Sequence, residues 1–172
     1  YVEVAGQLAL ATPPTTGYRL PTEAEWAWTA RHTGGGGSRR YPWGDAMPPP
    51  AGAGNFADRT AQGIVSNVLA DYSDGHAVTA PVGSFSASPL GLFDLGGNAA
   101  EWASDRYTVY PSGVPLAVDP TGPADGQYHV IRGSSWRHSG ISELRLSFRD
   151  FGDSGRLDVG FRIARTADDQ ER

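Results

Sequence analysis

The chain has 172 residues, a net charge of −5 at neutral pH and no cysteine. The length suits a single domain with its own core, and the acidic balance argues against a nucleic-acid surface. The absence of cysteine excludes disulfides, thiolate metal ligands and cysteine nucleophiles, and it leaves the cellular compartment open. No apolar run is long enough for membrane insertion. With 23 glycines and 13 prolines, we expect a loop-rich chain with few regular elements.

The first third of the chain predicts a hairpin and one helix. Residues 1–11 alternate around a glycine, which is typical of a small hairpin. In "LPTEAEWAWTARHTGGGG", Thr22 is a good N-cap, Glu25 completes a capping box and Gly34 begins the stop. The positions expected to face the core at helical spacing are Trp26, Ala27 and Ala30.

The middle of the chain carries few periodic signals. We expect Arg39 and Arg40 to be solvated loop charges, and "YPWGD" at 41–45 to form a turn with two aromatic residues. The glycines at 34–37 are not followed by the GK[ST] of a phosphate loop. Residues 46–90 are rich in proline and glycine, and only "TAPVGSF" at 79–85 suggests a short strand.

The last third is more regular. "HVIRGSSW" at 129–136 predicts a strand that runs into a turn, and "LRLSFR" at 144–149 alternates as a strand does. "DVGFRIAR" at 158–165 predicts a further strand, with an exposed loop before it. The expected core-facing residues of the two alternating segments are Leu144, Leu146, Phe148, Val159, Phe161 and Ile163. Together with a polar tail at 166–172, these elements indicate an α+β architecture with short antiparallel strands and few helices.

The stretch "GLFDLGGNAAEW" holds two carboxylates, Asp94 and Glu101, among small, apolar or uncharged residues. Two acids that converge without a basic neighbour repel each other unless a proton or a cation lies between them. One interpretation is a cation site. The alternative is that the two carboxylates cap turns or pair with arginines elsewhere in the fold.

Eight segments in order resemble one family. They are "YRLPTEAEWAWTAR", "YPWGD", "GNFAD", "TAPVGSF", "GLFDLGGNAAEWASDRY", "HVIRGSSW", "LRLSFRD" and "DVGFRIAR", between Tyr18 and Arg165. They look like the formylglycine-generating-enzyme (sulfatase-modifying factor) domain, whose fold is a variant of the C-type lectin fold. The resemblance implies a single domain over residues 1–172. Because the family domain has a further N-terminal part and the chain does not begin with methionine, we expect residue 1 not to be the native start.

The resemblance also implies structural calcium. The first ligand set would consist of side chains from Asp94 and Glu101 and carbonyls from Gly97 and Ala99. The second would consist of side chains from Asn55 and Asp74 and carbonyls from Phe56 and His76. The chemistry suits Ca²⁺, which takes about 6–8 hard oxygen ligands and accepts peptide carbonyls where carboxylates are too few.

The family's defining oxidation of a substrate cysteine uses copper held by two cysteines. Here the corresponding positions fall at His138 and at Ser142 or Glu143, none of which is a soft thiolate ligand. Ser134 and Ser135 show no nearby base in the sequence that could activate a nucleophile. A related branch resembles iron-dependent sulfoxide synthases of ergothioneine biosynthesis, but the chain's four histidines are scattered. An iron- or copper-dependent oxidase is therefore the alternative hypothesis.

The favoured hypothesis is a non-catalytic recognition or accessory domain that binds a protein or small-molecule ligand. The candidate surface runs from Trp136 to Glu143 and from Asp150 to Asp158. Its candidate ligand-binding residues are Trp136, Arg137, His138, Ser142, Glu143, Phe151, Asp153 and Arg156. Variable proteins of diversity-generating retroelements resemble this domain and vary in the same stretch, and other relatives are domains of larger bacterial polypeptides. The large aromatics, including Trp26, Trp43 and Trp102, are expected to pin the core.

Overall fold

The computed structural model describes residues 1–4, 6–9, 11, 15–35, 37–110, 113 and 117–167. Its elements are β1 (Val2–Val4), β2 (Gln7–Ala9), α1 (Glu23–Arg31), the 3₁₀ helix η1 (Arg59–Ala61), β3 (Ala100–Arg106), β4 (His129–Arg132), β5 (Arg149–Gly152) and β6 (Val159–Gly160). The expected α+β, loop-rich architecture is confirmed. Among the described residues, no helix is both long and apolar enough to cross a membrane. Most of the expected polar tail lies outside them.

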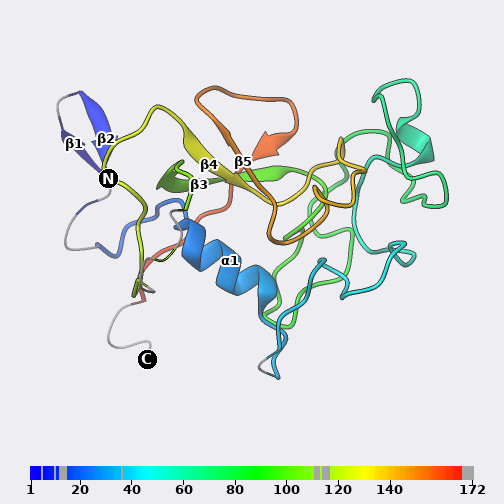
Figure 1. Ribbon diagram of the computed structural model, residues 1–172, viewed down its shortest axis with the longest axis horizontal. Helices are drawn as coiled ribbons and strands as arrows, with labels where there is room; N and C mark the ends of the chain where they lie inside the picture. Colours follow the sequence, from blue (N-terminus) through cyan, green and yellow to red (C-terminus); the bar gives the residue numbers. More distant parts are fainter. Residues whose placement is uncertain are drawn as a thin grey trace.

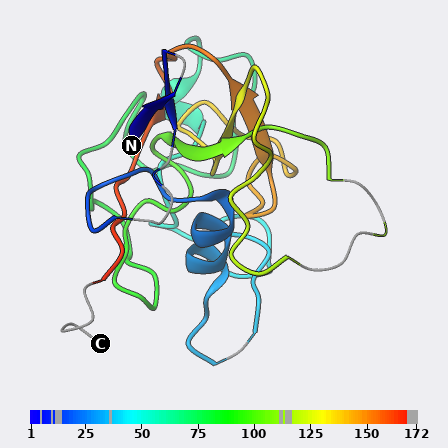
Figure 2. The same ribbon diagram turned by 90° about the vertical axis from the view of Figure 1, so that its left-hand side faces the viewer.

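The sheet has four strands in the order β5-β4-β3-β6. β3 pairs antiparallel with β4, β4 pairs antiparallel with β5, and the short β6 runs parallel to β3. In both views, α1 lies on one side of these strands (Figures 1 and 2). β1 and β2 form the expected antiparallel hairpin, and the long loops between α1 and β3 gather at the opposite end of the molecule (Figure 1).

The helix begins as its sequence predicts. Thr22 is the N-cap, its Oγ1 accepts a hydrogen bond from the Glu25 N–H at 3.1 Å, and the Glu25 carboxylate accepts one from the Thr22 N–H at 2.8 Å. Trp26 and Ala30 are buried in one core cluster, which confirms their assignment from helical spacing. The helix ends earlier than expected, because His32 rather than Gly34 forms the C-cap.

A second core cluster supports the loop end of the molecule. Tyr41, Phe56, Tyr72 and Leu144 are buried together. Trp43 stacks on Tyr41 with the ring centroids 5.0 Å apart. Aromatic side chains therefore supply the packing that regular elements do not provide here.

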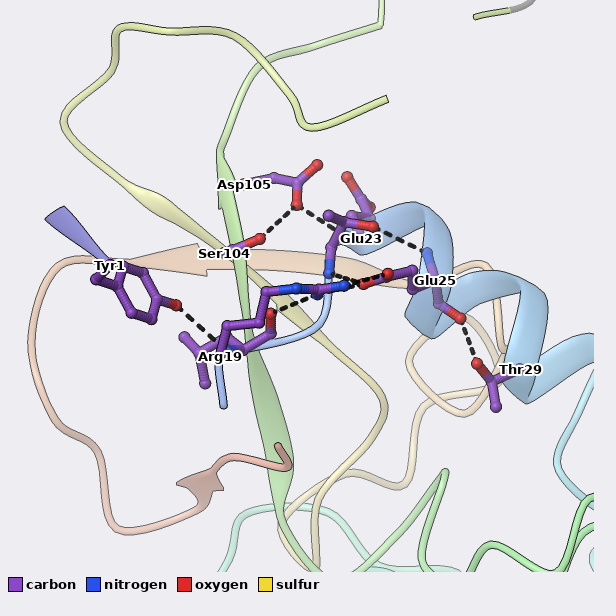
Figure 3. Close-up of polar contacts among 9 residues, drawn as sticks. Tyr1, Arg19, Glu23, Glu25, Thr29, Ser104 and Asp105 are labelled. Carbon is purple, nitrogen blue, oxygen red and sulfur yellow. Dashed lines mark hydrogen bonds and ion pairs between the residues drawn. The ribbon is translucent and has the colours of Figure 1, made fainter. Parts of the chain in front are cut away.

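The first turn of α1 is tied to the sheet by a buried carboxylate. Glu23 accepts hydrogen bonds from Arg149 Nε at 2.6 Å and Nη2 at 2.8 Å, and from the Tyr110 hydroxyl at 2.7 Å. The Glu23 N–H donates to Asp105 on β3 at 2.8 Å (Figure 3). Burial lowers the pKa of the neighbouring Arg132 to about 10. This network is one polar link between helix and sheet.

Two strands assigned from the sequence are absent from the structure, and one strand of the structure was not assigned. Residues 79–85 form a turn, because Pro81 and Gly83 interrupt the segment. Leu144 and Leu146 are buried as expected, but residues 144–148 form successive turns instead of a strand. The seven-residue strand β3 was not expected, because its sequence has no β-branched residues and follows a glycine-rich turn.

The alternation in 158–165 is opposite to the one expected. Phe161 and Ile163 are 69% and 59% exposed, whereas Arg162 turns inward. Arg162 forms an ion pair with the buried Glu101, with Nη2 2.5 Å from Oε1. Pairing of a buried charge outweighs the burial of two apolar side chains at the end of a short edge strand.

We predict that Glu23→Ala lowers the free energy of unfolding by about 3–5 kcal/mol, because it leaves the charges of Arg149 and Arg132 without their carboxylate. The matched variant Glu25→Ala removes an exposed carboxylate from the same helix turn and should cost about 1 kcal/mol. Urea denaturation of both variants measures the difference. Equal losses would show that the buried network adds nothing beyond the helix cap.

Candidate functional site

The two candidate binding segments meet around three side chains. Ser135 is fully buried, and its hydroxyl donates to Asp158 Oδ2 at 2.9 Å. The Ser135 N–H donates to His138 Nδ1 at 3.0 Å. His138 Nδ1 is therefore an acceptor, and in the neutral imidazole Nε2 carries the proton. These contacts join the turn after β4 to the loop before β6.

Arg156 closes the second loop. Its Nη1 lies 2.6 Å from Asp150 Oδ2, and its Nε lies 3.3 Å from Asp158 Oδ1. One guanidinium thus bridges the two ends of the segment 150–158. The loop is held in place by ion pairs.

The charges at this surface follow from burial and these partners. Burial lowers the pKa of His138, although the carboxylates of Glu143 and Asp158 oppose this shift. Burial alone would raise the pKa of Asp158, but hydrogen bonds from Arg156 and Ser135 bring it below its ordinary value. At neutral pH the surface therefore carries a neutral imidazole beside an ionised, paired carboxylate.

A hollow of about 570 Å³ lies at this surface. A second hollow, of about 300 Å³, lies elsewhere in the molecule. The hollow at this surface is lined by Arg137, His138, Gly155, Arg156, Leu157 and Asp158. Three of the eight ligand-binding residues expected from the sequence, Arg137, His138 and Arg156, are thus brought together. Arg137 is exposed, and its guanidinium lies 5.6 Å from the ring centroid of Trp136.

The other expected ligand-binding residues lie around the hollow without lining it. Trp136 is buried, and its indole Nε1 has no hydrogen-bond partner within the described chain. Ser142 is exposed, and Glu143 accepts a hydrogen bond from the Gly140 N–H at 2.9 Å. Phe151 belongs to β5, where it packs against two tyrosines, and Asp153 accepts from Gln127 at 3.4 Å.

Sequence reasoning missed the partners of Ser135. It found no base near this serine, yet His138 Nδ1 lies 3.4 Å from its hydroxyl and Asp158 lies 2.9 Å away. Asp158 is 23 residues further along the chain, so local spacing carries no signal for the contact. Ser135 is fully buried and donates to the carboxylate instead of the imidazole, so the trio orders the loops and does not present a nucleophile.

The first acidic set expected to bind calcium contains a carboxylate that already has partners. Glu101 is buried, and its Oε2 accepts hydrogen bonds from Trp26 Nε1 at 2.7 Å and from Arg162 Nε at 2.6 Å. Arg162 also donates to the Phe93 carbonyl at 3.1 Å. The structure thus pairs Glu101 with an arginine, which is the alternative that the sequence left open.

The rest of the first set lies in a tight turn. Asp94 has a φ of 55°, and its Oδ2 accepts a hydrogen bond from the Gly83 N–H at 2.9 Å. Gly97 has a φ of 89°, and a Cβ there would lie 2.7 Å from the Asn55 carbonyl. Ala99, half-buried, directly precedes β3. Glycine is required at 97 by both conformation and space.

The second set expected to bind calcium has an unused buried oxygen. Asn55 is fully buried, and its Nδ2 donates to the Val78 carbonyl at 2.7 Å and to Asn98 Oδ1 at 3.4 Å. Because Nδ2 faces these two acceptors, the amide oxygen lies on the other side of the group. Asn55 Oδ1 has no hydrogen-bond partner in the described part of the chain. A buried acceptor without a donor suits a cation.

Asp74 accompanies that oxygen. Its two oxygens accept hydrogen bonds from the N–H groups of Phe56 and His76, each at 2.9 Å. Burial raises the pKa of Asp74, although hydrogen bonds from the N–H groups of Phe56 and His76 and the nearby His76 side chain oppose this shift. The residues of this set therefore fit the oxygen chemistry of calcium. Among the described residues, no three His, Asp or Glu side chains converge as a metal site, so carbonyls would have to complete the coordination.

These features define a class of protein: a loop-rich domain of the formylglycine-generating-enzyme type, with no thiol at its C-terminal surface. Residues 1–167 match the family model of the sulfatase-modifying factor enzyme 1-like domain, and the chain belongs to that family. It is 38% identical over 171 residues to the formylglycine-generating enzyme of Streptomyces coelicolor, covering 97% of this chain and 52% of the relative. The chain thus spans about half the length of that relative.

Other relatives carry different names. A hercynine oxygenase of Mycolicibacterium thermoresistibile is 33% identical over 90% of this chain and 33% of its own length. The serine/threonine-protein kinase pkn1 of Chlamydia caviae is 35% identical over 87% of this chain but only 21% of its own length. Similar domains therefore occur within longer polypeptides.

Solved structures share the fold. Treponema denticola variable protein 1 superposes with a TM-score of 0.69 at 28% identity, covering 86% of this chain and 47% of its own. PvdO from Pseudomonas aeruginosa gives a TM-score of 0.63 at 28% identity, covering 87% and 53%. The fold assigned from the sequence motifs is confirmed.

The paired Asp158 predicts a pH dependence. Because its pKa is lowered in the folded state, its contribution to stability is present above about pH 4 and is lost as the pH falls through the lower, folded value. Asp158→Asn should therefore be less stable than the parent at neutral pH, and the difference should shrink in acid. Urea denaturation at several pH values measures it. A difference that stays constant down to pH about 2 would contradict the assignment.

Proposed function

We propose that this chain is a non-catalytic recognition domain that binds a protein or small-molecule ligand through its C-terminal loops. The observation that carries the proposal is the hollow between residues 137–138 and 155–158, framed by the ion pairs of Arg156. A rigid scaffold that presents loops is the usual arrangement for binding sites. The likeness to a protein named as variable supports the proposal.

The side chains at the hollow suit recognition better than the family's oxidation. His138 stands where the resemblance puts the first copper-binding cysteine, and its Nδ1 is engaged by the Ser135 N–H. Arg137 offers an exposed guanidinium, and Leu157 is 89% exposed. An exposed cation beside an exposed apolar side chain is a contact surface for an acidic or mixed ligand.

The proposed role of calcium is structural: it would hold loops together. The second set, with its unpartnered Asn55 Oδ1 and the carboxylate of Asp74, supports a bound calcium between two loops. The first set has weaker support, because Arg162 already balances the charge of Glu101. Calcium at Asp94 and Glu101 stays a prediction.

An iron- or copper-dependent oxidase is the second candidate. It is favoured by one observation, the 33% identity to a hercynine oxygenase. In that case His138 would need further ligands from a partner domain. Stoichiometric iron or copper in the purified chain, together with oxidation of a cysteine-containing peptide, would establish this candidate and overturn the recognition proposal.

We predict that peptides selected on the purified chain from a random display library lose about tenfold or more in affinity for Arg137→Ala, since this variant removes the exposed cation. His138→Ala should also weaken binding, and it should lower the melting temperature as well, because it removes the acceptor of the buried Ser135 N–H. The control is Trp28→Ala, which removes a 62% exposed aromatic from α1, away from the hollow. Selected peptides that bind all variants equally would refute the assignment of the surface.

Calcium should stabilise the folded chain. A ligand that binds only the folded state raises the free energy of unfolding by about 2.7 kcal/mol when its concentration is a hundred times the dissociation constant. Asp74→Ala should abolish the rise in melting temperature on calcium addition, whereas Asp71→Ala, which removes an exposed carboxylate three residues away, should leave it intact. A parent chain whose melting temperature is unchanged by calcium and by chelator would exclude this structural role of calcium.

A further inference from the structure

The second hollow, of about 300 Å³, lies between the loops that follow α1 and precede β3. It shares no lining residue with the C-terminal surface. Its apolar walls come from Pro42, Trp43, Pro50, Phe85, Leu92 and Leu95. The other lining residues are small, polar or charged, so the hollow combines apolar side chains with groups that can bind a charged ligand.

The only guanidinium lining this hollow is that of Arg39, and its charge has no carboxylate partner among the described residues. Sequence reasoning took Arg39 for a solvated loop charge, yet it is half-buried. Its Nε and Nη2 both donate to the Ala30 carbonyl, at 3.3 and 3.2 Å. That carbonyl belongs to the last turn of α1, so the helix holds the guanidinium in position.

The remaining nitrogen is available to a ligand. Arg39 Nη1 makes no hydrogen bond within the described residues. Burial lowers the pKa of Arg39, which reflects a cation that has lost water without gaining an anion. A carboxylate reaching Nη1 and Nη2 would supply that anion with the strength of a charge-assisted hydrogen bond.

The same hollow also carries one carboxylate. Asp94 lines it, and no ion pair joins Asp94 to Arg39. Asp94 Oδ2 accepts from the Gly83 N–H, which leaves Oδ1 without a hydrogen-bond partner in the described part of the chain. Asp94 has a φ of 55°, a left-handed backbone conformation that is uncommon for residues other than glycine. The hollow thus presents a separate cation and anion.

The aromatic wall is preassembled. Trp43 stacks on Tyr41 with an interplanar angle of 2°, and its Nε1 donates to the Ala46 carbonyl at 2.8 Å. The floor, at the lining residues Gly96 and Gly54, is packed against ring side chains: a Cβ on Gly96 would lie 2.3 Å from Pro42 Cγ, and one on Gly54 would lie 2.9 Å from the Phe56 ring. A rigid wall and floor reduce the entropy cost of binding.

We propose that this hollow binds a free amino acid with an apolar or aromatic side chain, with its carboxylate on Arg39, its ammonium group on Asp94 and its side chain against Trp43. The site is independent of the recognition surface proposed above, but it uses the Asp94 carboxylate of the first calcium set, so calcium and the amino acid would compete there. A residue inside a peptide lacks both charges, and a terminal residue has only one of them, so the pair of charges selects the free zwitterion.

The test is titration of the purified chain with three matched probes, followed by calorimetry. L-Phenylalanine should bind, whereas 3-phenylpropionate, which lacks the ammonium group, and phenethylamine, which lacks the carboxylate, should each bind about tenfold more weakly or worse, given the strength of hydrogen bonds to charged groups. Titrations with calcium and with chelator show whether a cation competes for Asp94. No binding of L-phenylalanine at about 1 mM in either condition would overturn the proposal.

Variants assign the two charges separately. Arg39→Gln should weaken phenylalanine binding about tenfold and leave phenethylamine binding unchanged, since only the carboxylate contact is lost. Asp94→Asn keeps the acceptor for Gly83 and tolerates the left-handed backbone, and it should weaken phenylalanine and leave phenylpropionate unchanged. Arg40→Gln, the exposed neighbour outside the hollow, is the control. If Arg39→Gln does not fold, Asp94→Asn alone tests the site. Equal affinity for phenylalanine in Asp94→Asn and in the parent would refute it.

Discussion

The carboxylate of Glu101 is the point on which the fold depends. It accepts hydrogen bonds from Trp26 on α1 and from Arg162 in the segment after β6, while its own backbone lies in β3. Helix, central strand and C-terminal segment therefore meet at one buried charge. A buried carboxylate is stable only where its partners surround it, so the inward turn of Arg162 and the outward turn of its apolar neighbours have the same cause.

Buried polar side chains replace regular structure in much of the rest of the molecule. Asn98 accepts a hydrogen bond from the Ala80 N–H at 2.9 Å and donates to the Ala80 carbonyl at 3.2 Å, much as a strand partner would. Asp58 accepts from the N–H groups of Asp74 and Thr60. Because buried backbone groups must find partners, these side chains allow long loops to be ordered without strands. Loops held this way can differ in their exposed residues, which suits a recognition surface.

The sequence predicted the parts of the fold that depend on local chemistry. The capping box of α1 and the burial of Trp26 follow from spacing alone, and ordered motifs identified the family. Alternation predicted the burial of Leu144 and Leu146 but not their conformation, because a chain of turns can also bury every second side chain. The outward orientation of Phe161 could not be predicted, since it results from an ion pair between residues 61 positions apart.

The sequence predicted the two hollows only in part. The family motif located the C-terminal surface, but nothing in the local sequence shows that Asp158 contacts Ser135 and Arg156 there. Arg39 was taken for a solvated charge because the sequence does not show that the Ala30 carbonyl lies within its reach. Family resemblance located the expected calcium ligands, but only the structure shows that Glu101 is already paired while Asn55 Oδ1 is not. Contacts distant in sequence therefore decide which of the expected ligand atoms already have partners.

A double-mutant cycle with Glu101→Gln and Arg162→Gln, measured by urea denaturation in calcium and in chelator, tests the central role of Glu101 most directly. We predict that the two single variants together lose about 2–3 kcal/mol more free energy of unfolding than the double variant, equally in both conditions. Losses that add to within about 0.5 kcal/mol, or a coupling that vanishes in chelator, would show that the carboxylate serves a cation and not the arginine.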